Sequence, residues 1–252
     1  MNIISASYGN DSIALLRWAY EQGIEDCYVV YAETGWCRQD WGRRVQVGEQ
    51  LAESYGFITW RVKGQFDFEG LVRAKKGFPS NGLQWCSGIL KGIPIDEFSD
   101  FLDPEARATM MIGKRREESE ERKDIPEFDY SSPFHGGRVV WHPLYKHTSG
   151  ERDNLIRKTG IEILPHRSME CCPCINANRA DLLRTPEEQI EKVRRLEKEV
   201  GNYMFREKKH MGAKGIDEVL KWAASDRGKY RPGQGMLWNY RGEFCQSGLC
   251  GS

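Results

Sequence analysis

Cysteines give the strongest chemical signal in this sequence, because three of the eight lie within the short stretch 171–174. Cys171 and Cys174 form a Cys-x-x-Cys pair, a spacing that lets the chain turn back onto one metal ion or one iron of a cluster. The same spacing suits a dithiol redox pair or two buried structural thiols. The N-terminus shows no secretory leader, so metal binding or redox chemistry is favoured over disulfides. Four further thiols are candidates for the same site: Cys86, Cys172, Cys245 and Cys250.

A second signal is a turn over residues 7–12 with the pattern Ser-x-Gly-x-Asp-Ser, between an apolar run and a helical pattern. Such a turn presents backbone N–H groups and hydroxyls to an anion at the positive end of a helix dipole. No Lys follows the glycine, so the turn is not a Walker A loop. The turn predicts a phosphate site. The alternative is an ordinary turn in which Asp11 or Ser12 caps the helix.

A dense run of charged residues over 114–124 is the third signal. Taken alone, the run fits a solvated helix face with i,i+4 ion pairs. It directly follows an apolar run that predicts a strand. At the C-terminal edge of that strand, Arg115 and Arg122 also suit the binding of polyphosphate or sulfate.

The predicted elements that position these signals alternate between strand and helix. Strands are expected over 2–6, 27–32, 57–62, 109–113 and 138–144, and helices over 13–20, 40–55, 66–74, 86–101, 151–159, 176–183, 186–200 and 216–224. This order predicts an α/β fold with a doubly wound, mostly parallel sheet. We expect a sheet domain over 1–165, and a helical, cysteine-bearing C-terminal region over 166–252 that packs on it. Thr185 should cap the helix over 186–200, with Glu188 completing a capping box.

The composition excludes several classes of protein. A hydrophobic fraction of 39% is too high for a disordered chain. A mean hydropathy of -0.64, without a long uncharged apolar stretch, excludes a membrane span. A net charge of zero argues against a protein that coats nucleic acid by bulk electrostatics. We expect a cytoplasmic protein in which Cys27 is a buried apolar side chain, while Cys37 is undecided.

The turn at 7–12 resembles the signature loop of the PP-loop ATP pyrophosphatases, in the adenine-nucleotide alpha-hydrolase superfamily. Three further segments are similar to the phosphoadenylylsulfate (PAPS) reductase branch of that superfamily. They are Glu33-Thr34-Gly35, Gly113-Lys114-Arg115-Arg116-Glu117-Glu118-Ser119 followed by Arg122, and His142-Pro143-Leu144 followed by Thr148 and the helix-forming Glu151-Arg152-Asp153. His147 stands where the branch has a tryptophan. The resemblance covers about residues 3–175 and makes 1–165 a PP-loop nucleotide-binding domain.

The resemblance implies that an adenine nucleotide binds at the 7–12 loop. Asp11 would orient Mg²⁺ or the adenylated oxygen, and Arg115 would neutralise charge on the transferring group. These two are the expected catalytic residues. The expected nucleotide-binding residues are Ser7, Gly9, Asp11, Ser12, Glu33, Thr34, Gly113 and Arg115.

The cysteines add a second resemblance. The segment from Cys86 to Pro94, with Lys91 inside it, resembles the Cys-Cys-x-x-x-Lys-x-x-Pro segment of adenylylsulfate-reducing relatives, with one cysteine missing. Those relatives bind a [4Fe–4S] cluster. The Cys-x-x-Cys pair is similar to that of the sulfur-inserting subunit of DNA phosphorothioation systems, which also carries an iron–sulfur cluster. The implied metal ligands are Cys86, Cys171, Cys174 and, as the preferred fourth, Cys250 rather than Cys245 or Cys172. Zinc bound by four thiolates is the alternative.

The expected activity is that of a PAPS reductase-like PP-loop enzyme. It would bind ATP, adenylate its substrate and support sulfur transfer. One alternative is a reductase of adenylylsulfate or PAPS, and another is a non-catalytic, metal-stabilised nucleotide-binding module. The resemblance leaves open a sulfur donor protein as partner, a nucleic-acid substrate and a homodimer, and no membrane partner is expected.

Overall fold

The computed structural model describes residues 1–80, 82–130, 132, 134–207 and 211–226. Its centre is a six-stranded sheet in the order β3-β2-β1-β4-β6-β5. All neighbouring strands are parallel except β5 and β6. The strands are β1 (Asn2–Ser5), β2 (Cys27–Ala32), β3 (Ile58–Val62), β4 (Thr109–Ile112), β5 (Phe128–Asp129) and β6 (Val140–Trp141). This confirms the expected α/β fold with a mostly parallel sheet.

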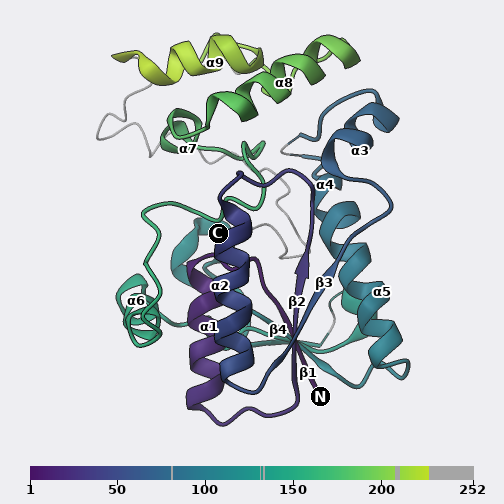
Figure 1. Ribbon diagram of the computed structural model, residues 1–252, viewed down its shortest axis with the longest axis vertical. Coiled ribbons are helices and arrows are strands. Elements are labelled where there is room, and N and C mark those ends of the chain that lie inside the picture. Colours follow the sequence, from purple (N-terminus) through teal and green to yellow (C-terminus); the bar gives the residue numbers. More distant parts are fainter. Residues whose placement is uncertain (81, 131, 133, 208–210, 227–252) are drawn as a thin grey trace.

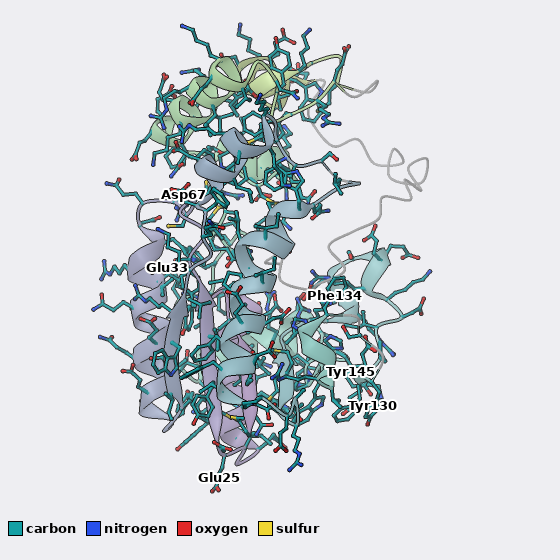
Figure 2. All side chains as sticks on the ribbon, turned by 90° about the vertical axis from the view of Figure 1, so that its right-hand side faces the viewer. Glu25, Glu33, Asp67, Tyr130, Phe134 and Tyr145 are labelled. Carbon is teal, nitrogen blue, oxygen red and sulfur yellow. The ribbon has the colours of Figure 1, made fainter. Side chains whose placement is uncertain are left out.

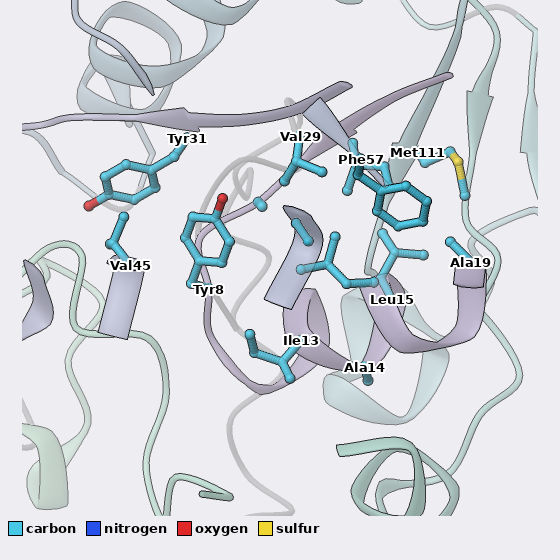
Figure 3. Close-up of a cluster of buried hydrophobic side chains, with 14 of the residues drawn as sticks. Tyr8, Ile13, Ala14, Leu15, Ala19, Val29, Tyr31, Val45, Phe57 and Met111 are labelled. Carbon is cyan, nitrogen blue, oxygen red and sulfur yellow. The ribbon is translucent and has the colours of Figure 1, made fainter. Parts of the chain in front are cut away.

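The central strands β1, β2 and β4 are mostly apolar, as is typical of a parallel sheet that is covered on both faces. Side chains alternate between the faces, so Ile4 belongs to one core and its neighbour Ile3 to the other. In Figure 1 the sheet is seen nearly edge-on, with α1, α2 and α6 on one side and α5 on the other. Figure 3 shows the first core, where Leu15 and Met111 pack between helix and strands.

The helices follow the expected order with shifted ends. The longer ones are α1 (Asn10–Glu21), α2 (Trp41–Ser54), α3 (Phe68–Lys75), α5 (Ile93–Leu102), α6 (Ser149–Arg157), α8 (Glu187–Val200) and α9 (Gly215–Ala224). The shorter ones are α4 (Trp85–Ser87), the π-helical turn η1 (Gly88–Gly92), η2 (Arg116–Glu118), η3 (Glu120–Arg122), η4 (His135–Gly137) and α7 (Arg179–Leu183). The helix expected over 86–101 is thus three successive pieces, and the charged run over 114–124 forms two short 3₁₀ turns.

A second core joins the C-terminal helices to the loops above the sheet. Val193 of α8 and Ile216 of α9 are fully buried there, together with Phe68 of α3 and Trp36 of the loop after β2. In Figure 1 this part lies beyond the end of the sheet. The helical C-terminal part is therefore confirmed. The domain boundary at 165 stays a prediction, and Met169, just beyond it, packs into the sheet core.

Two local expectations are wrong. Pro186, not Thr185, is the N-cap of α8, and no side chain caps this helix. The Thr185 hydroxyl instead donates to the Asp181 carbonyl at 3.1 Å, within the last turn before α8. The strand expected over 138–144 is only the two residues of β6, and the antiparallel β5 beside it was not expected.

Among the described residues, none of the helices combines the length and the apolar composition that a membrane crossing requires.

Candidate functional site

The 7–12 loop joins the end of β1 to the start of α1. The Ser7 N–H donates to the Ser12 Oγ at 3.0 Å, and the two hydroxyl oxygens lie 3.2 Å apart. Gly9 is the N-cap of α1, and its N–H donates weakly to the Ser7 Oγ at 3.3 Å. The loop therefore places hydroxyls and backbone N–H groups together at the positive end of a helix of twelve residues, where an anion is favoured.

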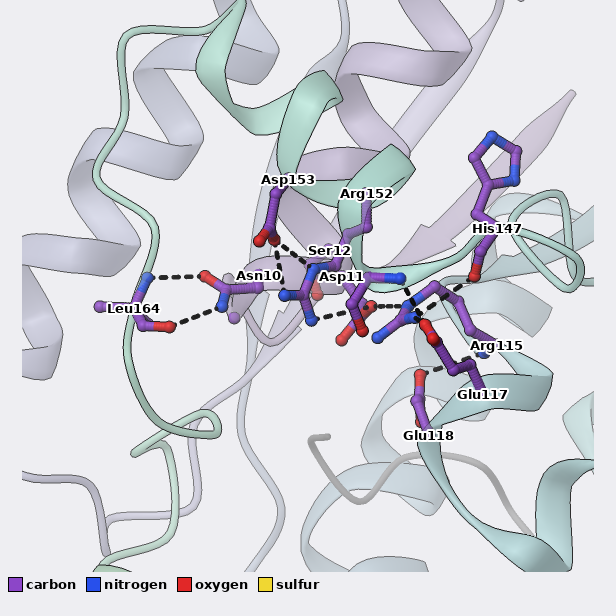
Figure 4. A network of polar contacts seen from close by, with 12 residues as sticks. Asn10, Asp11, Ser12, Arg115, Glu117, Glu118, His147, Arg152, Asp153 and Leu164 are labelled. Carbon is purple, nitrogen blue, oxygen red and sulfur yellow. Dashed lines mark hydrogen bonds and ion pairs between the residues drawn. The ribbon is translucent and has the colours of Figure 1, made fainter.

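A buried ion pair lies at the same helix end. The Arg115 Nε donates to the Asp11 Oδ1 at 2.5 Å, and the two side chains are only 3% and 7% exposed. A second guanidinium, that of Arg152, lies 3.9 Å from the same carboxylate oxygen (Figure 4). The sequence therefore predicted two residues that meet, but not the third. Arg152 lies in α6, within the third family-like segment, but no role was expected for it.

The end of β4 approaches α1 closely enough to require glycine. A Cβ on Gly113 would lie 3.0 Å from the Asp11 carbonyl oxygen. This close approach lets the chain turn from β4 towards Arg115 directly beside Asp11. Gly113 therefore contributes by its small size, and the 113–115 segment meets the 7–12 loop as expected.

The remaining contacts of Arg115 hold its guanidinium in place. Its Nη1 lies 3.2 Å from the Glu117 carboxylate and 3.3 Å from the His147 carbonyl oxygen. The backbone N–H of Arg115 donates to Glu118 at 3.0 Å. Glu118 also forms an ion pair with Arg122. Arg115 therefore contacts Asp11 at the loop, whereas Arg122 pairs with Glu118.

Glu33 and Thr34 follow β2 and differ in their surroundings. The Thr34 hydroxyl is buried and donates to the Glu170 carbonyl at 2.9 Å. The Glu33 carboxylate is exposed and lies 3.5 Å from Arg61. Figure 2 shows Glu33 and Asp67 near the junction between the sheet and the helical part. Thr34 thus holds the cysteine-bearing segment, and the expected nucleotide contact at Glu33 and Thr34 stays a prediction.

The loop after β2 pairs with the cysteine-bearing segment over several residues. The Cys172 N–H donates to the Trp36 carbonyl at 2.8 Å. The Trp36 indole N–H donates to the Pro173 carbonyl at 3.0 Å. The loop after β2 and the cysteine-bearing segment therefore form one hydrogen-bonded unit, although Thr34 and Glu170 are 136 residues apart in the sequence.

Three of the expected metal ligands meet at one pocket. Cys86 reaches it from α4, and Cys171 and Cys174 from the segment after α6. Cys172 packs instead into the sheet core. The other lining residues are Trp36, Phe68, Gln84, Ser87, Lys91, Arg167, Ser168, Glu170, Pro173, Ile175 and Met204. Cys245 and Cys250 lie outside the described residues. Within the described part of the chain, no three His, Cys, Asp or Glu side chains are grouped closely enough to hold one metal ion.

A buried ion pair also lies in this pocket. Lys91 of η1 and Glu170 are in contact, with side chains 7% and 5% exposed. Burial raises the pKa of the neighbouring Cys171 thiol to about 12, although the positive charge of Lys91 acts in the opposite direction. A thiolate at Cys171 therefore needs a further positive partner, such as a metal.

The pocket and the 7–12 loop share a wall. Ser168 lines the pocket. A Cβ atom added to Gly9 would lie only 3.1 Å from the Cβ atom of Ser168, so the two residues are in contact. Ser168 was not expected at the site, because nothing in its sequence context marks it. The contact shows that the two expected centres are adjacent.

Comparison with known proteins agrees with this architecture. The family model of the phosphoadenosine phosphosulfate reductase domain matches residues 1–174, and the chain belongs to this family. The match includes β1 to β6, α6 and the Cys-x-x-Cys pair, and it ends before α7.

Among solved structures, the chain is similar to phosphoadenylyl-sulfate (PAPS) reductase from Candida auris, in a phosphate complex. The sequences are 13% identical, the match covers 64% of this chain and 74% of that chain, and the TM-score is 0.44. A search of curated proteins gives no match.

Proposed function

We propose that this chain is a PP-loop enzyme that binds an adenine nucleotide at the 7–12 loop and uses it for substrate adenylation and sulfur transfer. The observation that carries the proposal is the contact between Ser168 and Gly9, which puts a pocket lined by three cysteines next to the 7–12 loop. A nucleotide seated on the loop would present its reacting end near the thiols. A nucleotide site alone would not need the cysteine pocket beside it, and a metal site alone would not need the 7–12 loop.

In the proposed reaction, a substrate oxygen attacks the α-phosphorus of ATP. The bond from that phosphorus to the bridging oxygen breaks, and pyrophosphate leaves. A sulfide or persulfide, supplied by a sulfur donor, then attacks the activated substrate atom, and AMP leaves with the oxygen. No net oxidation occurs when the donor is sulfide. When a persulfide attacks through its outer sulfur, the product stays joined to the donor by an S–S bond, and a thiol reductant must break that bond.

Arg115 is the proposed catalytic residue, since a guanidinium at the loop can neutralise charge on the transferring phosphoryl group. Asp11 was expected to orient Mg²⁺ or the adenylated oxygen. Its carboxylate already contacts Arg115 and lies close to Arg152. This arrangement favours Asp11 as a positioning residue for Arg115 over a role as a metal ligand. The backbone N–H groups of the loop and the hydroxyls of Ser7 and Ser12 would hold the phosphates.

Cys86, Cys171 and Cys174 line one pocket from two distant segments, and thiolates are the ligands that iron–sulfur clusters take. In the described residues they are not grouped closely enough to hold one metal ion, so a cluster would have to draw them together. We propose these three as ligands, with Cys250 as the fourth. Cys172 is the weakest choice because it packs into the sheet core. When bound, a cluster would supply soft iron sites that bind sulfur. Zinc on the same thiolates would instead be structural.

The first test is purification without oxygen, followed by iron, sulfide and zinc analysis and by a pyrophosphate-release assay with ATP. We expect iron and sulfide in equal amounts, their loss in Cys86→Ala and Cys174→Ala, and retention in the matched control Cys37→Ser. Folded, metal-free protein would contradict the cluster. Zinc without sulfide would support the structural alternative.

The family match also favours a second candidate, the reduction of PAPS or adenylylsulfate. In that reaction, two electrons from a thiol reductant release sulfite and leave the adenosine phosphate. Sulfite release from PAPS, without pyrophosphate release from ATP, would identify this activity. Nucleotide binding without either product would identify a non-catalytic module.

A further inference from the structure

A single segment, residues 162–174, connects the 7–12 loop with the cysteine pocket, and we call it the strap. Near its start, Asn10 forms two hydrogen bonds with the backbone of Leu164. The Asn10 amide donates to the Leu164 carbonyl at 2.9 Å, and the Leu164 N–H donates back to the Asn10 Oδ1 at 3.0 Å (Figure 4). Asn10 occupies one of the two variable positions of the Ser-x-Gly-x-Asp-Ser pattern, so the loop itself is hydrogen-bonded to the strap.

A second connection runs through α2. The Arg44 Nε donates to the Tyr8 carbonyl at 3.0 Å, and its Nη1 donates to the Glu162 carbonyl at 2.8 Å. One guanidinium therefore bridges the loop and the strap. Burial lowers the pKa of Arg44, and the two carbonyls partly replace its lost hydration. Tyr8, whose carbonyl it holds, has a φ of 57°, in the left-handed region that is uncommon for residues other than glycine.

The other end of the strap carries the pocket. Ser168 lies against Gly9, and beyond it the strap pairs with the loop after β2. The Arg38 N–H donates to the Met169 carbonyl at 3.0 Å, and Thr34 holds Glu170. Cys171 follows directly in the chain. A shift of the loop would thus reach Cys171 through a short segment that is hydrogen-bonded at both ends.

We propose that Asn10 and Arg44 are positioning residues that tie the geometry of the 7–12 loop to that of the cysteine pocket. Their consequence for the reaction rests on the proposed function, since a nucleotide on the loop would then order the pocket. By linkage, an occupied pocket would also favour nucleotide binding. Neither residue touches the expected reacting atoms, so their effect would pass through the strap.

The test compares the protein as isolated with Asn10→Ala, Arg44→Lys and the control Arg43→Lys. Lysine keeps the charge at position 44 but cannot bridge two carbonyls as a guanidinium does. Arg43 is its exposed neighbour on the same helix. Hydrogen exchange of strap peptides and labelling of Cys171 and Cys174 by N-ethylmaleimide are measured without nucleotide, then with ATP. Circular dichroism and the melting temperature check that each variant is folded.

Without ATP, we expect strap exchange and cysteine labelling to rise about fivefold or more in the two variants, and to stay within about twofold in Arg43→Lys. With ATP, exchange in the strap should slow in the unmodified protein and in the control, but not in the variants. A purely structural role would change the melting temperature without changing this ATP effect.

Folded variants with unchanged cysteine labelling would overturn the proposal, and so would faster labelling with an intact ATP effect. If ATP neither binds nor slows exchange in the unmodified protein, the proposed nucleotide function fails. Increased labelling in the variants would then still support the connection between loop and pocket. The two failures are therefore distinguishable.

Discussion

Two of the buried ion pairs, Asp11–Arg115 and Lys91–Glu170, have similar exposure and lie in different surroundings. Asp11 and Arg115 meet at a helix N-terminus, among further charged groups and a backbone carbonyl. Lys91 and Glu170 meet in a pocket whose lining combines two aromatic rings, three cysteines and Met204 with the polar residues Gln84, Ser87, Arg167 and Ser168. An arriving phosphate could replace one partner at the first pair. The second pair has less polar surroundings, so the loss of either member should cost more there.

The largest expected effect breaks the pocket pair. Glu170→Ala removes the carboxylate that pairs with the buried Lys91 ammonium. The free energy of unfolding should therefore fall by about 3–5 kcal/mol, measured by urea denaturation. The double variant Lys91→Met with Glu170→Leu should regain much of this loss, because no buried charge remains. Equal losses in the single and double variants would show that the ion pair does not determine the stability of the pocket.

The next expected effect is a loss of stability at low pH, caused by protonation of His142 beside β6. Burial lowers the pKa of His142 from 6.5 to about 4. Its Nδ1 lies 2.9 Å from the Pro126 carbonyl oxygen, and its Nε2 has no hydrogen-bond partner among the described residues. Because the unfolded chain binds the proton more tightly, stability is full above about pH 6.5 and falls towards about pH 4, by about 3 kcal/mol for this group.

Urea denaturation across this pH range measures the effect, with His142→Asn as the comparison. The variant should lose most of this part of the pH dependence. If the unmodified protein and His142→Asn lose stability in parallel as the pH falls, protonation of His142 does not cause the loss.

The loop pair should matter more for turnover than for folding. Asp11→Asn removes the charge that positions Arg115, and pyrophosphate release from ATP should fall about 100-fold. Arg115 keeps Glu117 and the His147 carbonyl, so the protein should remain folded. A variant with normal turnover would show that this pair is structural, like the one in the pocket.

The smallest expected effect concerns the packing of the Tyr8 ring, within the 7–12 loop, against Gly48 of α2. A Cβ on Gly48 would lie 2.1 Å from the Tyr8 ring, whereas one on Gly42 of the same helix would meet nothing within 4 Å. Gly48→Ala should therefore cost about 1–3 kcal/mol in urea denaturation. Gly42→Ala should stabilise the protein by about 0.5–1 kcal/mol. Equal effects of the two substitutions would mean that Tyr8 moves freely.

The sheet was largely predictable because its central strands are apolar runs separated by helical patterns. The short edge strands β5 and β6 were not, since two residues carry too little pattern to mark a strand. Thr185 failed as a cap because its hydroxyl found a nearer carbonyl in the preceding turn. Sequence pattern does not show which of two nearby backbone groups such a hydroxyl reaches.

The contact between Asp11 and Arg115 could be predicted, because both follow neighbouring strands by a few residues. Asp11 lies in the first turn of α1 after β1, and Arg115 lies just beyond β4, which pairs with β1. Asn10, Arg44 and Ser168 were missed, because each acts through backbone contacts that only the folded chain brings together. Tertiary contacts of this kind leave no local mark in the sequence.

Trp36 makes the cysteine pocket optically observable. Its side chain is 1% exposed and lines the pocket, and its ring stacks on Phe68 with the ring centroids 4.6 Å apart. An indole so shielded from water should fluoresce at short wavelength. A bound chromophore that absorbs in that range would quench it by energy transfer. The difference in emission between the unmodified protein and Trp36→Phe would thus follow the filling and emptying of the pocket in solution.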